Sequence, residues 1–277
     1  KSIIFSYPAA INEIQGGIHN SFDKIYLNKI SGLYDLGLLE IANKFGNLTK
    51  IFINSISNSW VPYFMKKSKN ELSNKEKVSD RYIEIVVFIN LVSVFFSIFS
   101  EEAIKILTNE KFYFVKYYIP FILYNVYLGN IFNLIFKLEI FKNKKMHLQI
   151  PVSFITFFSS ILLNIILIPI YGIWGLIIAL ILSTIASNGF MYFKLNNFFK
   201  DRDMTKKFFL QILLFTIILP IIYWIMLLDL SLTTKIIIKS LLLFGYFYML
   251  LILKLISYQR ILQLVKQSIQ IISKKNA

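Results

Sequence analysis

Five ionisable or amide side chains recur along residues 35–65 at positions that fall on one face of an α-helix. They are Glu40, Lys44, Asn47, Asn54 and Asn58. Residues spaced by about 3.6 positions share a helix face, and these positions follow that period. A charged group at the bilayer centre costs at least about 2.5–3.5 kcal/mol, so its presence there needs a reason. This pattern therefore predicts a helix face that lies against a water-filled cavity or a partner helix and not against lipid.

A second polar face precedes the first, within residues 3–30. Its members are Glu13, Gly16, Asn20 and Lys24, with Asp23 beside them. A charged side chain within the membrane is costly, so these groups should face water or a partner helix and not lipid. For Asp23 and Lys24 a place at the membrane interface is the alternative, and Glu40 can instead form a structural ion pair with Lys44.

Weaker polar patterns occupy two further segments. Asn130, Asn133 and Lys137 are spaced on one helix face, although Lys137 can also extend to the membrane surface. Ser153, Thr156, Ser160 and Asn164 form the other pattern, which is typical of hydrogen bonds between membrane helices. Residues 208–255 are nearly all apolar, and we expect this last pair of helices to face lipid.

The elements that carry these side chains are predicted to be membrane helices. Residues 146–193 contain no Asp, Glu, Lys or Arg, and Pro169-Ile170-Tyr171-Gly172 divides them. A bilayer core about 30 Å thick needs about 20 apolar residues per helix. We therefore expect an all-α integral membrane protein of about eight spans, at residues 3–30, 35–65, 82–107, 113–141, 147–168, 173–193, 208–228 and 235–255.

The basic residues indicate the orientation of these spans. Connections 66–81, 142–147 and 194–207 hold fourteen Lys or Arg residues, whereas the alternate connections hold two. Because basic connections stay in the cytoplasm, both chain ends are predicted to lie there. The net charge of +15 is thus explained largely by topology, and a nucleic-acid partner is not expected. Residues 256–275 have the pattern of an amphipathic helix with a basic face.

Catalytic and metal sites are not indicated. The chain has no cysteine and two histidines far apart in sequence, so neither a zinc site nor a bound cofactor is expected. No phosphate-binding glycine loop and no nucleophile–base arrangement occurs. We expect a transporter and not an enzyme. Since the chain begins at Lys1 without a signal-peptide pattern, we also expect it to begin within a longer protein.

Two stretches of sequence resemble a known transporter family. The first comprises residues 23–27, 37, 41–45 and 60–62. The second, residues 164–175, is similar to the family's tight hairpin pattern Asn-x-x-Leu-Ile-Pro-x-Tyr-Gly-x-x-Gly, although Leu176 follows where a small Ala is common. The family is that of O-antigen type polysaccharide flippases, which serve lipopolysaccharide synthesis within the multidrug/oligosaccharidyl-lipid/polysaccharide exporter superfamily (the MATE-like fold).

The resemblance implies a domain plan and a location. Residues 1–200 would form the C-terminal six-helix lobe of the transporter, 201–255 two additional membrane helices, and 256–277 an amphipathic cytoplasmic tail. The N-terminal lobe would be missing from this chain. Asn164, Pro169, Tyr171, Gly172 and Gly175 would shape the hairpin. The location implied is the bacterial inner membrane.

The resemblance also implies an activity. Alternating access would move undecaprenyl-pyrophosphate-linked oligosaccharide from the inner to the outer leaflet. The coupling ion would be a proton or sodium ion bound by Glu13, Asp23 or Glu40, since a partly buried carboxylate has a tunable proton affinity. The partners would be this lipid-linked oligosaccharide, membrane lipids and the missing lobe. Lys24, Lys44 and Lys137 would meet the pyrophosphate, and Asn47, Asn54, Asn58 and Asn133 the sugars.

Three other functions stay open at this point. An ion-coupled drug or cation exporter of the same fold would favour acidic residues in its cavity. A membrane enzyme of polysaccharide assembly, such as a polymerase or acyltransferase, usually needs a larger polar loop than the short outward connections provide. A structural partner subunit is the third alternative.

Overall fold

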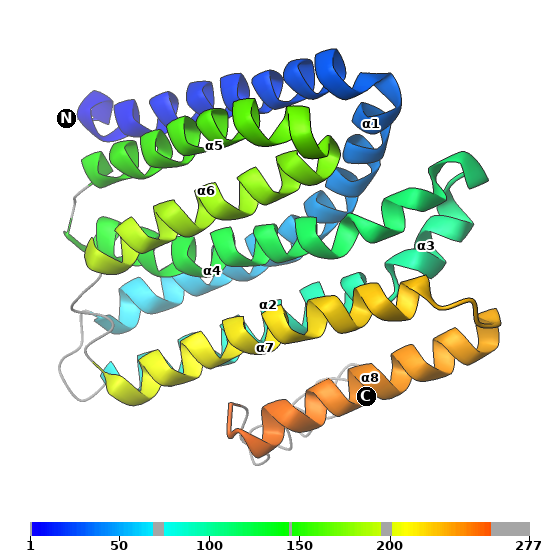
Figure 1. Ribbon diagram of the computed structural model, residues 1–277. Helices are drawn as coiled ribbons and strands as arrows, with labels where there is room; N and C mark the ends of the chain where they lie inside the picture. Colours follow the sequence, from blue (N-terminus) through cyan, green and yellow to red (C-terminus); the bar gives the residue numbers. More distant parts are fainter. Residues whose placement is uncertain (1, 69–74, 144–145, 195–200, 256–277) are drawn as a thin grey trace, which may run out of the picture.

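The computed structural model describes residues 2–68, 75–143, 146–194 and 201–255, and all of its regular elements there are helical (Figure 1). The predicted amphipathic tail at 256–277 lies outside the described residues. In chain order the elements are α1 (Ser2–Ser68), α2 (Lys75–Ile98), α3 (Ser100–Leu107), the 3₁₀ helix η2 (Glu110–Tyr117), α4 (Ile119–Asn143), the 3₁₀ helix η3 (Met146–Leu148), α5 (Gln149–Tyr171), α6 (Ile173–Lys194), α7 (Arg202–Leu227) and α8 (Leu232–Ile252).

Six of the described helices are long and apolar enough to cross a membrane. They comprise 81–98 of α2, 119–137 of α4, and α5, α6, α7 and α8. This confirms the predicted class, an all-α multi-pass membrane protein. Helix α1 is more polar and is not among the six, yet both of its halves run along the bundle, the first beside α5 and the second beside α4 (Figure 1).

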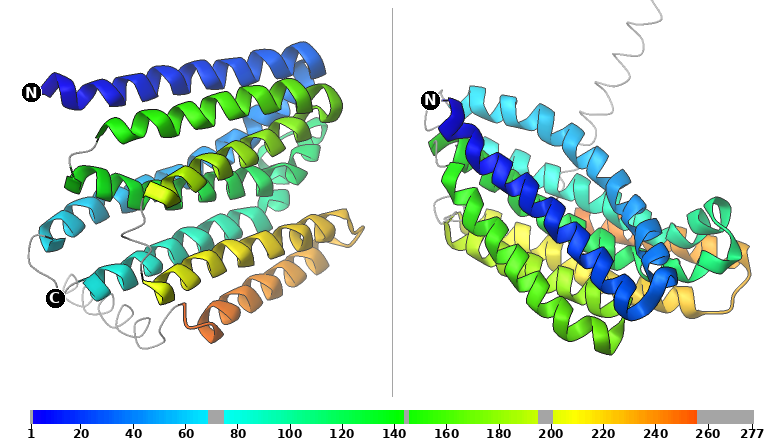
Figure 2. Two further views of the ribbon diagram at one scale, coloured as in Figure 1. Left: turned by 60° about the vertical axis from the view of Figure 1, so that its left-hand side comes forward. Right: turned by 90° about the horizontal axis from the view of Figure 1, so that it is seen from above.

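Helix α1 bends sharply at Gly32, which divides it into a first half (2–31) and a second half (33–68). Gly32 has φ +88° and ψ 175°, a conformation that lies outside the helical region and that favours glycine. The bend falls in the connection predicted between the first two spans. The two halves diverge from it, as the view from above shows (Figure 2).

The predicted span 82–107 is wrong at its end, because α2 stops at Ile98 and the short helix α3 follows. Ser93, Ser97 and Ser100 each donate a hydroxyl hydrogen bond to a backbone carbonyl three or four residues earlier. Such bonds compete with the helical ladder and bend helices. The predicted start of the next span at 113 is also wrong, since η2 occupies 110–117 and α4 begins at Ile119.

Helix α4 lies at the centre of the bundle and contributes to both apolar clusters. One cluster joins α4 to α2 and α7 through residues such as Tyr127, Val86 and Phe215. The other joins α4 to the second half of α1 and to α6, through residues such as Leu123 and Leu38. Close packing on both sides holds α4 in place. The apolar face of the second half of α1 packs on α4, and the polar face of that half therefore lies on the other side.

The hairpin between α5 and α6 is tight and seats against the bend of α1. Gly172 has φ +56°, and a Cβ there would lie 3.3 Å from Ser31 Oγ and 3.4 Å from Asp35 Oδ2. A Cβ on Gly175 would overlap the backbone carbonyl of Leu167. Asn164 is buried, whereas Pro169 and Tyr171 are exposed. Glycine at 175 is therefore required for α5 and α6 to approach each other.

We expect Gly175→Ala to destabilise the protein strongly, because the obstructing atoms belong to the backbone of Leu167 and cannot rotate away. Overpacking of this kind costs about 1–3 kcal/mol. The measurement is thermal unfolding of the purified protein in detergent. Gly189→Ala in the same helix is the control, since a Cβ at Gly189 meets nothing within 4 Å. Equal melting temperatures for the two variants would contradict the packing argument.

Candidate functional site

The predicted polar stripe on the second half of α1 faces away from the rest of the bundle. The opposite face carries buried Leu38, Ala42 and Phe45 and packs on α4. Lys44, Asn47, Asn54 and Asn58 are exposed, and Glu40 is half-buried. A cationic and amide-rich face is thus presented along a helix whose neighbours are membrane spans. Lipid cannot satisfy these groups, so the stripe requires water, a ligand or another protein segment.

Glu40 forms its ion pair with Lys24 across the bend of α1, and not with Lys44 as the sequence suggested. Lys24 Nζ lies 2.7 Å from Glu40 Oε1, and the two side chains are 36% and 42% exposed. Both residues are eight positions from Gly32, so folding the helix back at that glycine brings them together. Glu13 and Asn20 are also exposed on the first half. The pair therefore connects the polar residues of the two halves.

A second group of polar side chains lies between the first half of α1 and α5. We name it the α1–α5 seam. Its members are Asn12, Gln15, His19, Asp23, Gln149, Ser153, Ser160 and Asn164. Asn164 Nδ2 donates to Asp23 Oδ1 over 2.7 Å. Ser153 donates to Asn12 Oδ1 over 2.7 Å. The predicted hydrogen bonds of α5 with a neighbouring helix are therefore confirmed for Ser153 and Asn164. Thr156 instead donates to the carbonyl of Val152, and Ser160 accepts from Asn164, both within α5. The Asp23 side chain is buried.

Some polar atoms of the α1–α5 seam have no hydrogen-bond partner among the residues that the structure describes. Both amide atoms of Gln15, His19 Nε2 and Asn164 Oδ1 are buried without a hydrogen-bond partner. His19 Nε2 lies 3.7 Å from Asp23 Oδ2, beyond hydrogen-bonding distance. Burying such atoms unpaired is costly, so this arrangement favours a water molecule, a proton or a small cation beside Asp23. Among the described residues, no group of three or more His, Asp or Glu side chains is placed to hold a metal.

The remaining predicted contacts lie in α4. Asn133 is partly buried and Lys137 is exposed near the end of that helix. Asn130 donates to the carbonyl of Val126 over 2.8 Å, so its amide is occupied within α4. The structure does not test whether Asn133 or Lys137 meets a ligand together with the α1 stripe, and both stay predictions.

The sequence analysis missed a charged cluster at the end of the bundle where α3 and η2 lie. We name it the Glu101 cluster. Its members are Glu101, Glu102, Lys105, Lys116, Lys235 and Lys239. It corrects the expectation for the last two helices in part. Apolar side chains of α7 and α8 such as Leu213 and Phe244 are exposed, as lipid-facing residues would be, but Lys235 and Lys239 of α8 are buried. Burial alone would raise the pKa of Glu101, but hydrogen bonds from Lys239, Lys116 and Lys235 lower it to about 2. The spacing of Lys235 and Lys239, one helical turn apart in an otherwise apolar segment, was the available signal.

Comparison with known proteins yields one relative. The chain is 26% identical over 200 residues to "Capsular polysaccharide biosynthesis protein CapF" of Staphylococcus aureus, which covers 69% of this chain and 48% of that protein. The chain thus spans about half the length of the curated relative it matches. No protein family and no solved structure matches the chain.

Asn164→Ala should destabilise the protein by about 1–3 kcal/mol, because it leaves the buried Asp23 carboxylate without its hydrogen-bond donor. The measurement is the shift in thermal unfolding in detergent. Asn58→Ala is the matched control, since the same side chain is removed from an exposed position. If both variants unfold at the same temperature, the bond between Asn164 and Asp23 contributes nothing to stability.

Proposed function

We propose that this chain is part of a flippase that moves undecaprenyl-pyrophosphate-linked oligosaccharide from the inner to the outer leaflet for surface polysaccharide synthesis. The proposal takes its biological setting from the relative, whose name assigns it to capsular polysaccharide biosynthesis. It takes its chemistry from the exposed stripe of α1. Movement of the headgroup occurs by alternating access around this stripe.

The stripe carries the proposal because it addresses the main obstacle to such transport. A pyrophosphate with attached sugars cannot enter hydrocarbon without losing the water that solvates its charges and hydroxyls. Lys44 supplies positive charge to the pyrophosphate, and Lys24 adds to it when the headgroup displaces its ion-pair partner Glu40. Three exposed asparagines supply hydrogen bonds to the sugars. Together they replace part of the lost hydration along the second half of α1.

The α1–α5 seam supplies a place for the coupling ion. Asp23 is buried beside unpartnered amide and imidazole atoms, an environment that favours binding of a proton or sodium ion. Glu13 is exposed and Glu40 is engaged with Lys24, so Asp23 is the best supported of the three carboxylates. Binding and release of the ion then alters how the first half of α1 packs on α5.

The proposed partner of the stripe is a second lobe of the same transporter. A polar face of this length must be enclosed with water inside a membrane protein. The exposed side chains of α1 point outward from the described bundle, as a surface that lines a cavity between two lobes would. The proposed location is the bacterial inner membrane, with the basic connections in the cytoplasm.

A membrane enzyme of polysaccharide assembly is the second candidate, because the name of the relative fits a polymerase or an acyltransferase equally well. The two functions differ in what the stripe does. An enzyme that loses its reaction leaves the lipid-linked oligosaccharide unmodified on either leaflet, whereas a failed flippase leaves completed oligosaccharide facing the cytoplasm.

We expect Lys44→Ala, Glu40→Ala and the double variant Asn54→Ala/Asn58→Ala each to reduce glycan export several-fold at equal expression. The measurement is surface polysaccharide together with the leaflet location of the lipid-linked oligosaccharide in cells that express the gene in its native context. Lys111→Ala is the control, because the Lys111 side chain is exposed in η2 and is not part of the stripe. Full export in all three stripe variants removes the stripe from the mechanism.

The hydration of the stripe can be measured independently with single cysteines, since the chain has none of its own. Cysteines at Asn47, Asn54 and Asn58 should react with a membrane-impermeant thiol reagent in inverted or right-side-out vesicles. Cysteines at Leu213 and Phe158, which are exposed on membrane-spanning helices, should be protected by lipid. Protection of all three stripe positions would leave the proposed headgroup without a route.

A further inference from the structure

The inner face of α8 is mostly polar, although α8 is a membrane-spanning helix. Its buried residues are Lys235, Lys239, Tyr246 and Leu250, and they share one helical face. Lys235, Lys239 and Tyr246 form ionic or hydrogen-bonded contacts, and Leu250 is apolar. Tyr246 donates to Asn90 Oδ1 of α2 over 2.5 Å, and the two lysines contact Glu101 and Glu102 of α3.

Lys239 is the centre of these contacts. Its ammonium group lies 2.9 Å from Glu101 Oε2, and 2.7 and 2.9 Å from the two oxygens of Glu102. An ammonium has three protons, so all of its donors are used. Its side chain is 1% exposed, as is that of Glu101. Removal of Lys239 would break the contact of α8 with Glu102, and only Lys235 would then join α8 to Glu101.

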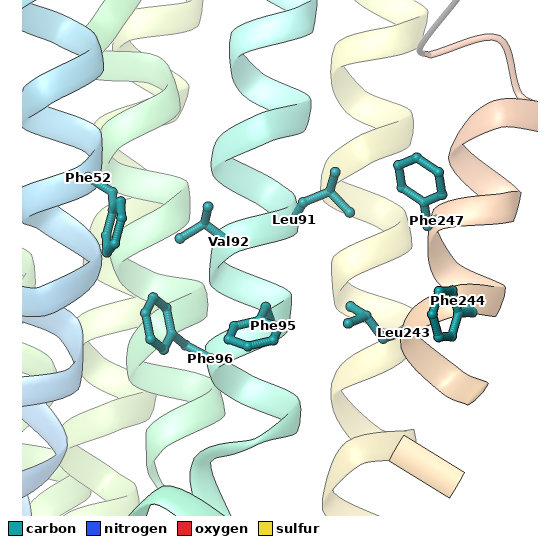
Figure 3. A pocket seen from close by; sticks show the side chains of 8 residues that line it. All are labelled: Phe52, Leu91, Val92, Phe95, Phe96, Leu243, Phe244 and Phe247. Carbon is teal, nitrogen blue, oxygen red and sulfur yellow. The ribbon is translucent and has the colours of Figure 1, made fainter. Parts of the chain in front are cut away.

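Apolar packing between α8 and α2 is incomplete beside these contacts. A pocket of about 410 Å³ lies among side chains of α1, α2 and α8, and its lining is wholly apolar (Figure 3). Leu91 and Phe95 of α2 line it on one side, and Leu243 and Phe247 of α8 on the other. Space at this level means that α8 is not held against α2 by close apolar contact along its whole length.

We propose that the Glu101 cluster docks α8 onto the bundle and sets its register, with Lys239 as the specific determinant. Lipid is as apolar as the surface of α8, so burial of apolar side chains gives little preference for one position of the helix. Ion pairs in this environment do give a preference, because sliding or rotating α8 would separate two lysines from two carboxylates. The cluster also positions the pocket-lining residues of α8, because Lys239 lies one helical turn before Leu243.

The docking role extends to α3 and η2. Glu101 accepts from Lys116 of η2 over 3.0 Å as well as from both lysines of α8. One carboxylate therefore joins α3, η2 and α8, and α8 lies more than a hundred residues from the other two elements in sequence. The bend that ends α2 at Ile98 is what places Glu101 beyond the apolar span and opposite α8.

A cross-linking experiment tests this docking in the otherwise cysteine-free chain. Cysteines replace Leu91 and Phe247, which both line the pocket, and a short bifunctional maleimide joins them in membranes. Lys239→Glu should lower the cross-linking yield several-fold, because it places a third carboxylate beside Glu101 and Glu102. The double variant Glu102→Lys/Lys239→Glu should recover yield by restoring an opposite pair. Lys111→Glu, an equal charge change at an exposed site, should leave the yield unchanged.

A second cysteine pair separates undocking of α8 from general misfolding. Cysteines at Asn12 and Ser153 report contact between α1 and α5, whose side chains are hydrogen-bonded in the native protein. The proposal requires that this pair still cross-links in Lys239→Glu. If it does not, the neutral Lys239→Met variant decides: a lower α2–α8 yield with an intact α1–α5 yield supports the proposal. Undiminished α2–α8 yield in Lys239→Glu or Lys239→Met overturns it.

Discussion

The cost of placing a polar group in hydrocarbon is the constraint on which this structure depends. Each charged or amide side chain in an apolar bundle needs a protein partner, water or a ligand. The chain meets this need in two ways. Asp23, Glu101 and Lys239 find protein partners, whereas Lys44 and the exposed asparagines of α1 do not find them within the described bundle.

Polar side chains with a structural role can thus be told apart from those that are candidates for a functional role. Paired and buried groups hold helices together, because lipid gives apolar faces little reason to associate in one register. The exposed polar groups on the second half of α1 have no such structural role in the described bundle. The second half of α1 therefore differs in kind from α8, although both carry lysines among apolar neighbours. The lysines of α8 are buried in ion pairs, whereas Lys44 is exposed.

The α1–α5 seam lies between these two cases. Its hydrogen bonds from Asn164 to Asp23 and from Ser153 to Asn12 fasten the helices together. Polar atoms of Gln15 and His19 have no partner among the described residues, so the hydrogen bonding between α1 and α5 is incomplete. A buried carboxylate next to unsatisfied donors and acceptors is sensitive to a single proton or cation, since one charge changes the balance of the whole seam. Such sensitivity suits a coupling element better than a purely structural one.

The sequence by itself determined the helices and their polar faces. Uncharged runs of about twenty residues marked the spans, and helical periodicity placed Glu40, Lys44 and the three asparagines on one face, because both depend only on local spacing. Tertiary structure alone decided the partners. The bend at Gly32 paired Lys24 with Glu40, the break after Ile98 placed Glu101 opposite Lys239, and the close approach of α5 buried Asp23. A partner depends on how helices distant in sequence are folded back on one another, and periodicity within one segment carries no information about that.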